Sequence, residues 1–194
     1  MADHNLTEKI ILASSSPRRA EILRSVGWPF EIVPASVDET LSDGEEPISY
    51  VTRLARAKAE AGSRELVPGA LVLGADTTVV VDREILGQPR DAADARRMLK
   101  LLSGEWHEVI TGVALLRSGV AASGIVAHET TRVRFSCLSD EEIDWYVATD
   151  EPTGKAGAYA IQGRAALFIE EIQGDYLNIV GLPVRLVYEL SKRV

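Results

Sequence analysis

The apolar stretch ALVLGA, from Ala70 to Ala75, constrains the fold of this chain more than any other feature. It is short, almost wholly apolar and followed by Asp76, a pattern that predicts a buried strand. The other long apolar stretches are broken by Asp82 or Glu170, and none approaches the roughly 20 residues that span a membrane. We therefore expect a core built around strands, and no membrane partner.

Strand and helix patterns mix along the chain without strict alternation. Strands are predicted at 9–13, 30–35, 108–116, 125–135 and 165–172, with a hairpin that turns at 82–84. Helices are predicted from a Ser16 cap with Pro17 at the first position, at 48–61, 91–102 and 139–148, and from Pro183 onward. This mixture predicts an α/β fold with a mixed, partly antiparallel sheet. Since no linker or repeat interrupts the chain, we expect one domain over residues 1–194.

The composition limits the classes of partner. The chain has 194 residues, of which 46 % are hydrophobic and 26 % charged, as is usual for a soluble globular domain. Its net charge of −8 argues against a general nucleic-acid binder, which needs a basic face. The single cysteine, Cys137, permits no internal disulfide and fits a reducing cytoplasm. The polar first residues do not resemble a signal peptide.

The stretch LASSSPRR, from Leu12 to Arg19, combines a strand end, a short loop and a helix start. The first amides of a helix lack internal partners and carry partial positive charge, which favours an anion. Ser14 adds a hydroxyl, and Arg18 and Arg19 add guanidinium groups that suit phosphate. The alternative is a serine cap with two solvated arginines.

Asp76 and Lys58 are the next candidates. A carboxylate at the end of a buried strand, followed by the hydroxyl of Thr77, suits a metal ligand or a general base. The alternative is a tight turn that the Asp closes onto the backbone. Lys58 falls on the apolar stripe of its predicted helix, where it either extends to solvent or reaches an anion.

Two loops supply weaker candidates. Glu39 belongs to an acidic loop whose charges are either solvated or bind a divalent cation. The segment KAGAYAIQGRAALF, from Lys155 to Phe168, is rich in glycine and small residues, which let a backbone approach a ligand closely. Lys155 suits phosphate, and the Gln162 amide suits a nucleobase edge. The alternative is a flexible loop before a strand.

Taken together, these segments resemble one family. LASSSPRR, the VDE of 37–39, RLARAKA, GADT, LGQPRD, AGAYAIQG and GDYLNIVGLP occur in the order that is typical of Maf proteins. The resemblance covers nearly the whole chain. It implies the Maf/Ham1-like α/β fold, with an elongated sheet that forms a central cleft and is flanked by helices. It also implies hydrolysis of nucleoside triphosphates to monophosphate and pyrophosphate with Mg²⁺ or Mn²⁺.

The resemblance assigns roles to single positions. Asp76 matches the catalytic proton acceptor, and Glu39 and Lys58 match polar groups that line the cleft; Asp76 and Glu39 are the implied metal ligands. The positions that match substrate-binding groups are Ser14, Arg18, Arg19, Thr77, Gln88, Lys155 and Gln162. Arg18, Thr77 and Gln162 match positions associated with substrate choice, and AYAIQG is similar to the subfamily that acts on dTTP and UTP.

The chain departs from the family pattern at two positions. Gln88 stands where a lysine is usual, so we expect weaker phosphate attraction there. Ala160 stands where glycine is common, so we expect a slightly stiffer loop.

Two alternative functions stay open at this point. The first is a pyrophosphatase for 7-methyl-GTP or another nucleotide. The second is a nucleotide-binding regulator linked to cell division and septum formation, an association known for Maf proteins. The family also suggests a housecleaning role and a homodimer.

Overall fold

The computed structural model describes residues 8–119 and 124–194, which form two compact units. Unit 1 comprises the chain up to Asp76, the segment Thr111–Glu129 and the segment Gly181–Val194. Unit 2 comprises Thr77–Ile110 and Thr130–Val180. The number of domains stays a prediction.

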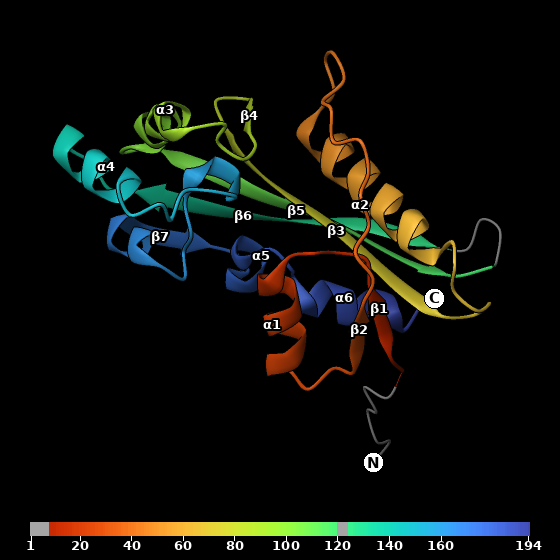
Figure 1. Ribbon diagram of the computed structural model, residues 1–194. Coiled ribbons are helices and arrows are strands. Elements are labelled where there is room, and N and C mark those ends of the chain that lie inside the picture. Colours follow the sequence, from red (N-terminus) through yellow and green to blue (C-terminus); the bar gives the residue numbers. More distant parts are fainter. Residues whose placement is uncertain (1–7, 120–123) are drawn as a thin grey trace. The chain divides into compact units, whose positions relative to one another are not determined.

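The described strands form a seven-stranded mixed sheet in the order β2-β1-β3-β5-β6-β7, with β4 paired to β3 (Figure 1). β1 runs parallel to β2 and β3, whereas β4 is antiparallel to β3 and β7 to β6. Helices flank this sheet, which confirms the predicted α/β class with a partly antiparallel sheet. The strands are β1 (Ile10–Leu12), β2 (Phe30–Ile32), β3 (Leu71–Val81), β4 (Glu84–Leu86), β5 (Trp106–Arg117), β6 (Ile125–Phe135) and β7 (Ile169–Gln173).

In unit 1, helix α2 (Pro47–Ser63) packs unusually close to the strands. A Cβ atom added at Gly74 of β3 would lie 2.1 Å from the carbonyl oxygen of Ala55, and one added at Gly112 of β5 would lie 2.3 Å from that of Val51. Small buried side chains fill the rest of this contact. The glycines therefore set the distance between α2 and the sheet.

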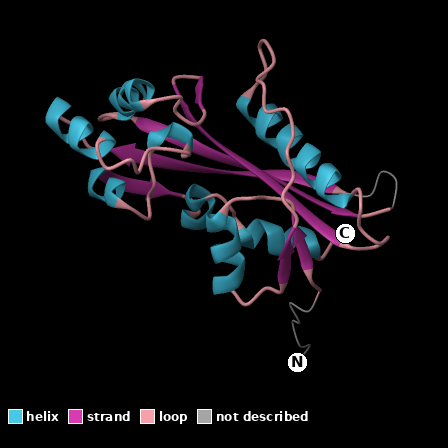
Figure 2. Ribbon diagram, viewed as in Figure 1, coloured by secondary structure: helices cyan, strands magenta, loops and turns pink. Residues whose placement is uncertain are grey.

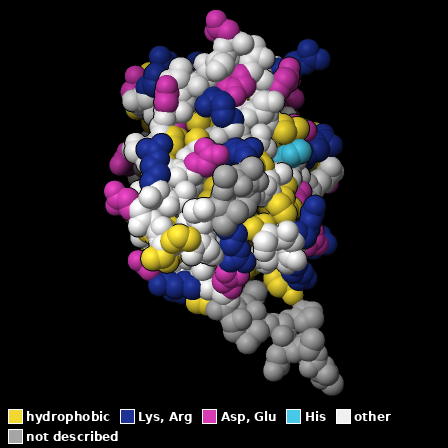
Figure 3. Space-filling model, turned by 90° about the vertical axis from the view of Figure 1, so that its right-hand side faces the viewer, with side chains coloured by type: hydrophobic (Ala, Val, Ile, Leu, Met, Phe, Trp, Pro, Cys, Tyr) yellow, Lys and Arg dark blue, Asp and Glu magenta, His cyan; other side chains and the backbone are white. Residues whose placement is uncertain are grey.

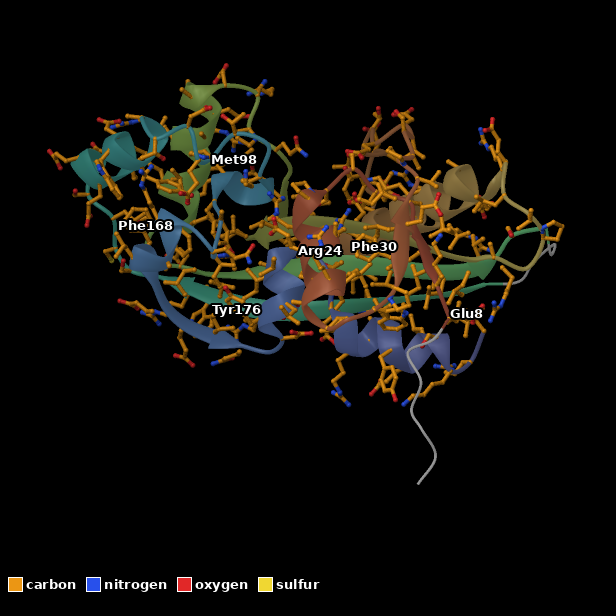
Figure 4. All side chains as sticks on the ribbon, turned by 60° about the horizontal axis from the view of Figure 1, so that its bottom comes forward. Glu8, Arg24, Phe30, Met98, Phe168 and Tyr176 are labelled. Carbon is orange, nitrogen blue, oxygen red and sulfur yellow. The ribbon has the colours of Figure 1, made fainter. Side chains whose placement is uncertain are left out.

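Two further helices complete unit 1, namely α1 (Pro17–Ser25) and α6 (Val184–Ser191). In Figure 1, α2 lies above the long strand β3 and α6 lies below it. α1 begins with Pro17 as predicted, although the Ser16 side chain makes no capping bond. At the far end of α1, the Arg24 guanidinium lies 5.8 Å from the centre of the Phe30 ring on β2 (Figure 4).

Unit 2 contains α3 (Ala92–Leu102), α4 (Asp140–Val147), α5 (Tyr176–Val180) and the 3₁₀ helices η1 (Ala156–Ala158) and η2 (Arg164–Phe168). The predicted capping box of Ser139 and Glu142 is present at the start of α4. An aromatic cluster forms the core of this unit: His107, Phe135, Tyr146, Tyr159 and Phe168.

Two sequence predictions of local structure were wrong, and one helix was not predicted. The buried strand does not end at Ala75 but continues to Val81, so Asp76 lies within β3 rather than at its end. The segment 165–172 is a strand only from Ile169, because its first part forms η2. Helix α5 was not predicted; it spans a single turn, too short to show helical periodicity.

None of the helices within the described ranges combines the length and apolarity needed to cross a bilayer. On the face that Figure 3 shows, Lys and Arg side chains are interspersed with Asp and Glu side chains. The cytoplasmic location and the lack of a nucleic-acid partner stay predictions.

Candidate functional site

Lys58 lies between two carboxylates at the centre of the site in unit 1. Its ammonium nitrogen is 2.6 Å from Asp76 Oδ1 and 2.6 Å from Glu39 Oε1. The side chains of Lys58 and Asp76 are each 11 % exposed, whereas that of Glu39 is 52 % exposed. Lys58 therefore reaches anions from the apolar face of its helix, and the predicted alternative of a solvated lysine is wrong.

Three elements bring these side chains together. Asp76 lies on β3, three residues past Leu73, the last β3 residue that pairs with β1. Lys58 extends from α2, which Gly74 allows to pack closely on β3. Glu39 belongs to the long loop between β2 and α2 (Figure 2).

Burial raises the pKa of Asp76 above the usual range, and the charge and hydrogen bond of Lys58 and the charge of Arg19 partly offset this shift. A carboxylate with a raised pKa is a stronger base than one in water. The environment of Asp76 is thus suited to accepting a proton.

Tyr50, which the sequence analysis did not single out, holds the Glu39 loop. Its hydroxyl donates to the backbone carbonyl oxygen of Glu39 at 3.0 Å. Burial raises the pKa of Tyr50, and the nearby charges of Asp76 and Glu39 raise it further. The only sequence signal was its place one turn before Leu54 on the inner side of the helix.

Other charges of the acidic loop have local partners. Glu45 forms an ion pair with Arg53 at 2.7 Å, and Asp38 accepts hydrogen bonds from the backbone and side chain of Thr40. Glu39 is the loop carboxylate that reaches the buried lysine.

The serine turn before α1 is organised around the Ser14 hydroxyl. Its oxygen accepts hydrogen bonds from the Ser16 amide at 3.2 Å and from Arg19 Nη1 at 3.0 Å. The first backbone hydrogen bond of the helix runs from Ala20 to Ser16. The amides of the preceding turn therefore lie outside the helical ladder. Those of Ser14 and Ser16 already donate within the turn, to the Leu12 carbonyl oxygen and the Ser14 hydroxyl, and the anion site stays a prediction.

The two arginines have different environments. Arg19 is buried, and its Nε donates to the Gly181 carbonyl oxygen at 2.8 Å. Burial lowers the pKa of Arg19, and the charge of Asp76 opposes this effect. Arg18 is half-buried, and burial also lowers its pKa. The sequence carried no signal for the contact with Gly181.

The remaining predicted site residues belong to unit 2. Thr77 follows Asp76 on β3 and is half-buried, and Gln88 is exposed in the loop after β4. Lys155 Nζ donates to the Thr153 carbonyl oxygen at 3.1 Å, and Gln162 is exposed between η1 and η2. The Gly157 amide donates to the Gly87 carbonyl oxygen at 3.0 Å, which joins the loop of Gln88 to η1.

The fold defines the chain as an α/β protein of the Ham1 architecture. The Ham1 protein of Staphylococcus aureus superposes with a TM-score of 0.54 at 12 % identity, over 96 % of this chain and 99 % of the other. This similarity shows the fold alone. The chain belongs to the Maf family, because the sequence model of this family, described as "Maf-like protein", matches residues 9–194.

Curated relatives of similar length match closely. A protein of Symbiobacterium thermophilum, named dTTP/UTP pyrophosphatase, is 55 % identical over 94 % of this chain and 92 % of its own length. A protein of Anaeromyxobacter dehalogenans with the same name is 51 % identical over 97 % of this chain and 95 % of its own length.

Proposed function

We propose that the protein hydrolyses dTTP and UTP to the nucleoside monophosphate and pyrophosphate. The observation that carries the proposal is the buried Lys58 between Asp76 and Glu39, in the same unit as the Ser14–Arg19 turn. An acid–base group beside an anion site is what phosphoryl hydrolysis needs. The names of the relatives support the substrate class.

The triphosphate binds at the Ser14–Arg19 turn. The Arg18 guanidinium donates to phosphate oxygens, and the partial positive charge at the start of α1 favours the anion. Arg19, whose Nε and Nη1 bind Gly181 and Ser14, fixes the turn and adds its positive charge. Lys58, which lies beside Asp76, offsets part of the negative charge of the triphosphate.

The residues present fit a divalent cation. Asp76 and Glu39 converge on one positive charge, since both carboxylates lie 2.6 Å from the Lys58 ammonium. Among the described residues, no group of three metal-binding side chains was found. Mg²⁺ is often bound by one or two carboxylates, with phosphates and water as further ligands, so two carboxylates suffice. An ion held by Asp76 and Glu39 would polarise the phosphate.

Asp76 acts as the general base. It accepts a proton from the attacking water, whose oxygen forms a bond to the α-phosphorus. The bond from the α-phosphorus to the oxygen that bridges to the β-phosphate breaks, and pyrophosphate leaves. No covalent intermediate with the protein is needed.

The segment around Gln162 selects the base. Its amide offers a donor and an acceptor, which suits the carbonyl and N–H groups of uracil and thymine. Thr77 and Arg18 contribute to substrate choice, and Lys155 and Gln88 contact phosphates.

The proposal is tested by measuring pyrophosphate release from a panel of NTPs, dNTPs and modified nucleotides with Mg²⁺, Mn²⁺ or EDTA. Metal-dependent release that favours dTTP and UTP, with ¹⁸O from labelled water in the monophosphate, is the expected result. Release from 7-methyl-GTP alone would overturn the substrate class. Tight binding without release would overturn the activity and favour the regulator, and Gln88→Lys would then be the first variant to test.

A further inference from the structure

In unit 2, the Glu151 carboxylate binds the backbone on the C-terminal side of Gln162. Glu151 Oε2 accepts from the Arg164 amide at 3.1 Å, and Oε1 accepts from the Ala165 amide at 3.4 Å. Both amides belong to the first turn of η2, immediately after Gly163. One carboxylate therefore anchors the backbone two and three residues beyond Gln162.

Tyr146 binds the backbone on the N-terminal side of Gln162. Its hydroxyl accepts from the Ala160 amide at 3.2 Å and donates to Glu151 Oε1 at 2.9 Å. The Tyr146 ring is fully buried in α4 and packs edge-on against Phe168, with ring centres 5.4 Å apart. Burial raises the pKa of Tyr146, so the hydroxyl keeps its proton and remains a donor to Glu151.

Gly163 shows how tightly the carboxylate packs on this loop. A Cβ atom added at Gly163 would lie 2.3 Å from Glu151 Oε1 and 2.6 Å from Oε2. The φ angle of Gly163 is −111°, outside the left-handed region that favours glycine. While the Glu151 carboxylate keeps its position, the contact leaves no room for a larger residue.

The loop thus presents an exposed Gln162 from a backbone that is anchored on both sides. Ile161, the intervening residue, is buried. A hydrogen-bonding side chain discriminates between bases only when its position is fixed to within about 0.5 Å. The anchoring groups come from α4 and the turn after it, outside the loop itself.

We infer that Glu151 and Tyr146 are positioning residues for base selection: they hold the 160–165 backbone so that Gln162 reads the pyrimidine edge. This inference rests on the proposed function. It predicts that loss of either group weakens discrimination between bases while hydrolysis itself continues.

The test compares Tyr146→Phe, Glu151→Ala and Glu151→Gln with the wild-type protein. Matched controls are Tyr176→Phe and Glu141→Gln, at an exposed tyrosine and an exposed glutamate of the same unit. Initial rates with UTP, dTTP and GTP give kcat and KM for each variant. Hydrogen exchange at the amides of residues 160–165, without nucleotide, reports on the loop directly.

Tyr146→Phe and Glu151→Ala should raise KM for UTP and dTTP by about tenfold, the size expected for loss of one or two hydrogen bonds. The kcat should change by less than about threefold, and KM for GTP should stay constant. Exchange at residues 160–165 should be faster. Glu151→Gln retains an acceptor oxygen and should give an intermediate effect.

An unchanged ratio of UTP to GTP efficiency in Tyr146→Phe would overturn the inference, whether the rates fall uniformly or stay the same. Should Glu151→Ala not fold, Tyr146→Phe still decides the question because it keeps the buried ring. Absence of pyrophosphate release from the wild-type protein is a different result, which overturns the proposed function itself.

Discussion

Lys58 Nζ and Asp76 Oδ1 lie 2.6 Å apart in side chains that are each only 11 % exposed. A buried ion pair of this kind is costly to break from one side, because the remaining charge loses its partner. The pair also links the helix face that carries Lys58 to the strand that carries Asp76.

Replacing Asp76 by Asn should lower kcat for UTP by at least about a hundredfold, since the amide keeps the shape but cannot accept the water proton. Asp43→Asn is the matched control, because Asp43 is exposed in the loop of Glu39. Steady-state kinetics with equal Mg²⁺ measure both. Near-normal turnover of Asp76→Asn would remove Asp76 from the role of base.

Replacing Lys58 by Met should move the acid limb of the pH–rate profile to higher pH. Lys58 lowers the pKa of Asp76, so its loss raises that pKa. A base must be deprotonated to act, and the raised pKa means that activity is lost at a higher pH as the solution is acidified. We expect the acid limb of kcat/KM to lie at higher pH than in the wild-type protein. Arg56→Met, at an exposed position of α2, is the control; an acid limb that stays in place would contradict the assignment.

Replacing Gly74 by Ala should destabilise unit 1 by about 1–3 kcal/mol, because the added methyl meets the Ala55 carbonyl oxygen. The helix must shift, and Lys58 shifts with it, so kcat should also fall by about tenfold or more. Urea denaturation and kinetics check the two effects. Gly87→Ala is the stability control, since a Cβ atom there meets nothing within 4 Å. Equal stability of the two variants would contradict the close packing.

His107 should make unit 2 less stable in mild acid. Burial lowers the pKa of His107 from 6.5 to about 4, so between these values the unfolded chain binds a proton that the folded chain does not. The contribution of His107 to the free energy of unfolding is present above pH 6.5 and is lost as the pH falls toward 4. At pH 5, the free energy of unfolding is lower by about 2 kcal/mol than at neutral pH.

The measurement is urea denaturation at pH 7.5 and pH 5 of the wild type, His107→Gln and the exposed control His128→Gln. His107→Gln should lose less stability between the two pH values than the other two proteins. Identical losses in all three would show that His107 is not responsible.

Local patterns in the sequence predicted the elements that are stabilised by contacts between residues close together in the chain. The stripe of apolar residues on α2 and the Ser139–Glu142 capping box are examples, and both depend on residues a few positions apart. The apolar face also indicated Lys58, yet its partner was left open. Only the fold brings Glu39 and Asp76 to its ammonium group.

Distant contacts explain the errors. β3 was expected to end at Ala75 because Asp76 is polar, but Lys58 compensates the carboxylate and the strand continues. The segment from Ala165 was expected to be extended, but the Glu151 carboxylate binds the first amides of η2. Periodicity carries no information about either partner.

The bond from Arg19 to Gly181 joins residues 162 positions apart, and the last segment of unit 1 begins at Gly181. During synthesis, the serine turn leaves the ribosome well before this partner, which lies 162 residues further along the chain. A nascent chain or a product of premature termination before Gly181 lacks that acceptor for its buried guanidinium. The order of translation thus delays completion of the turn until Gly181 has been made.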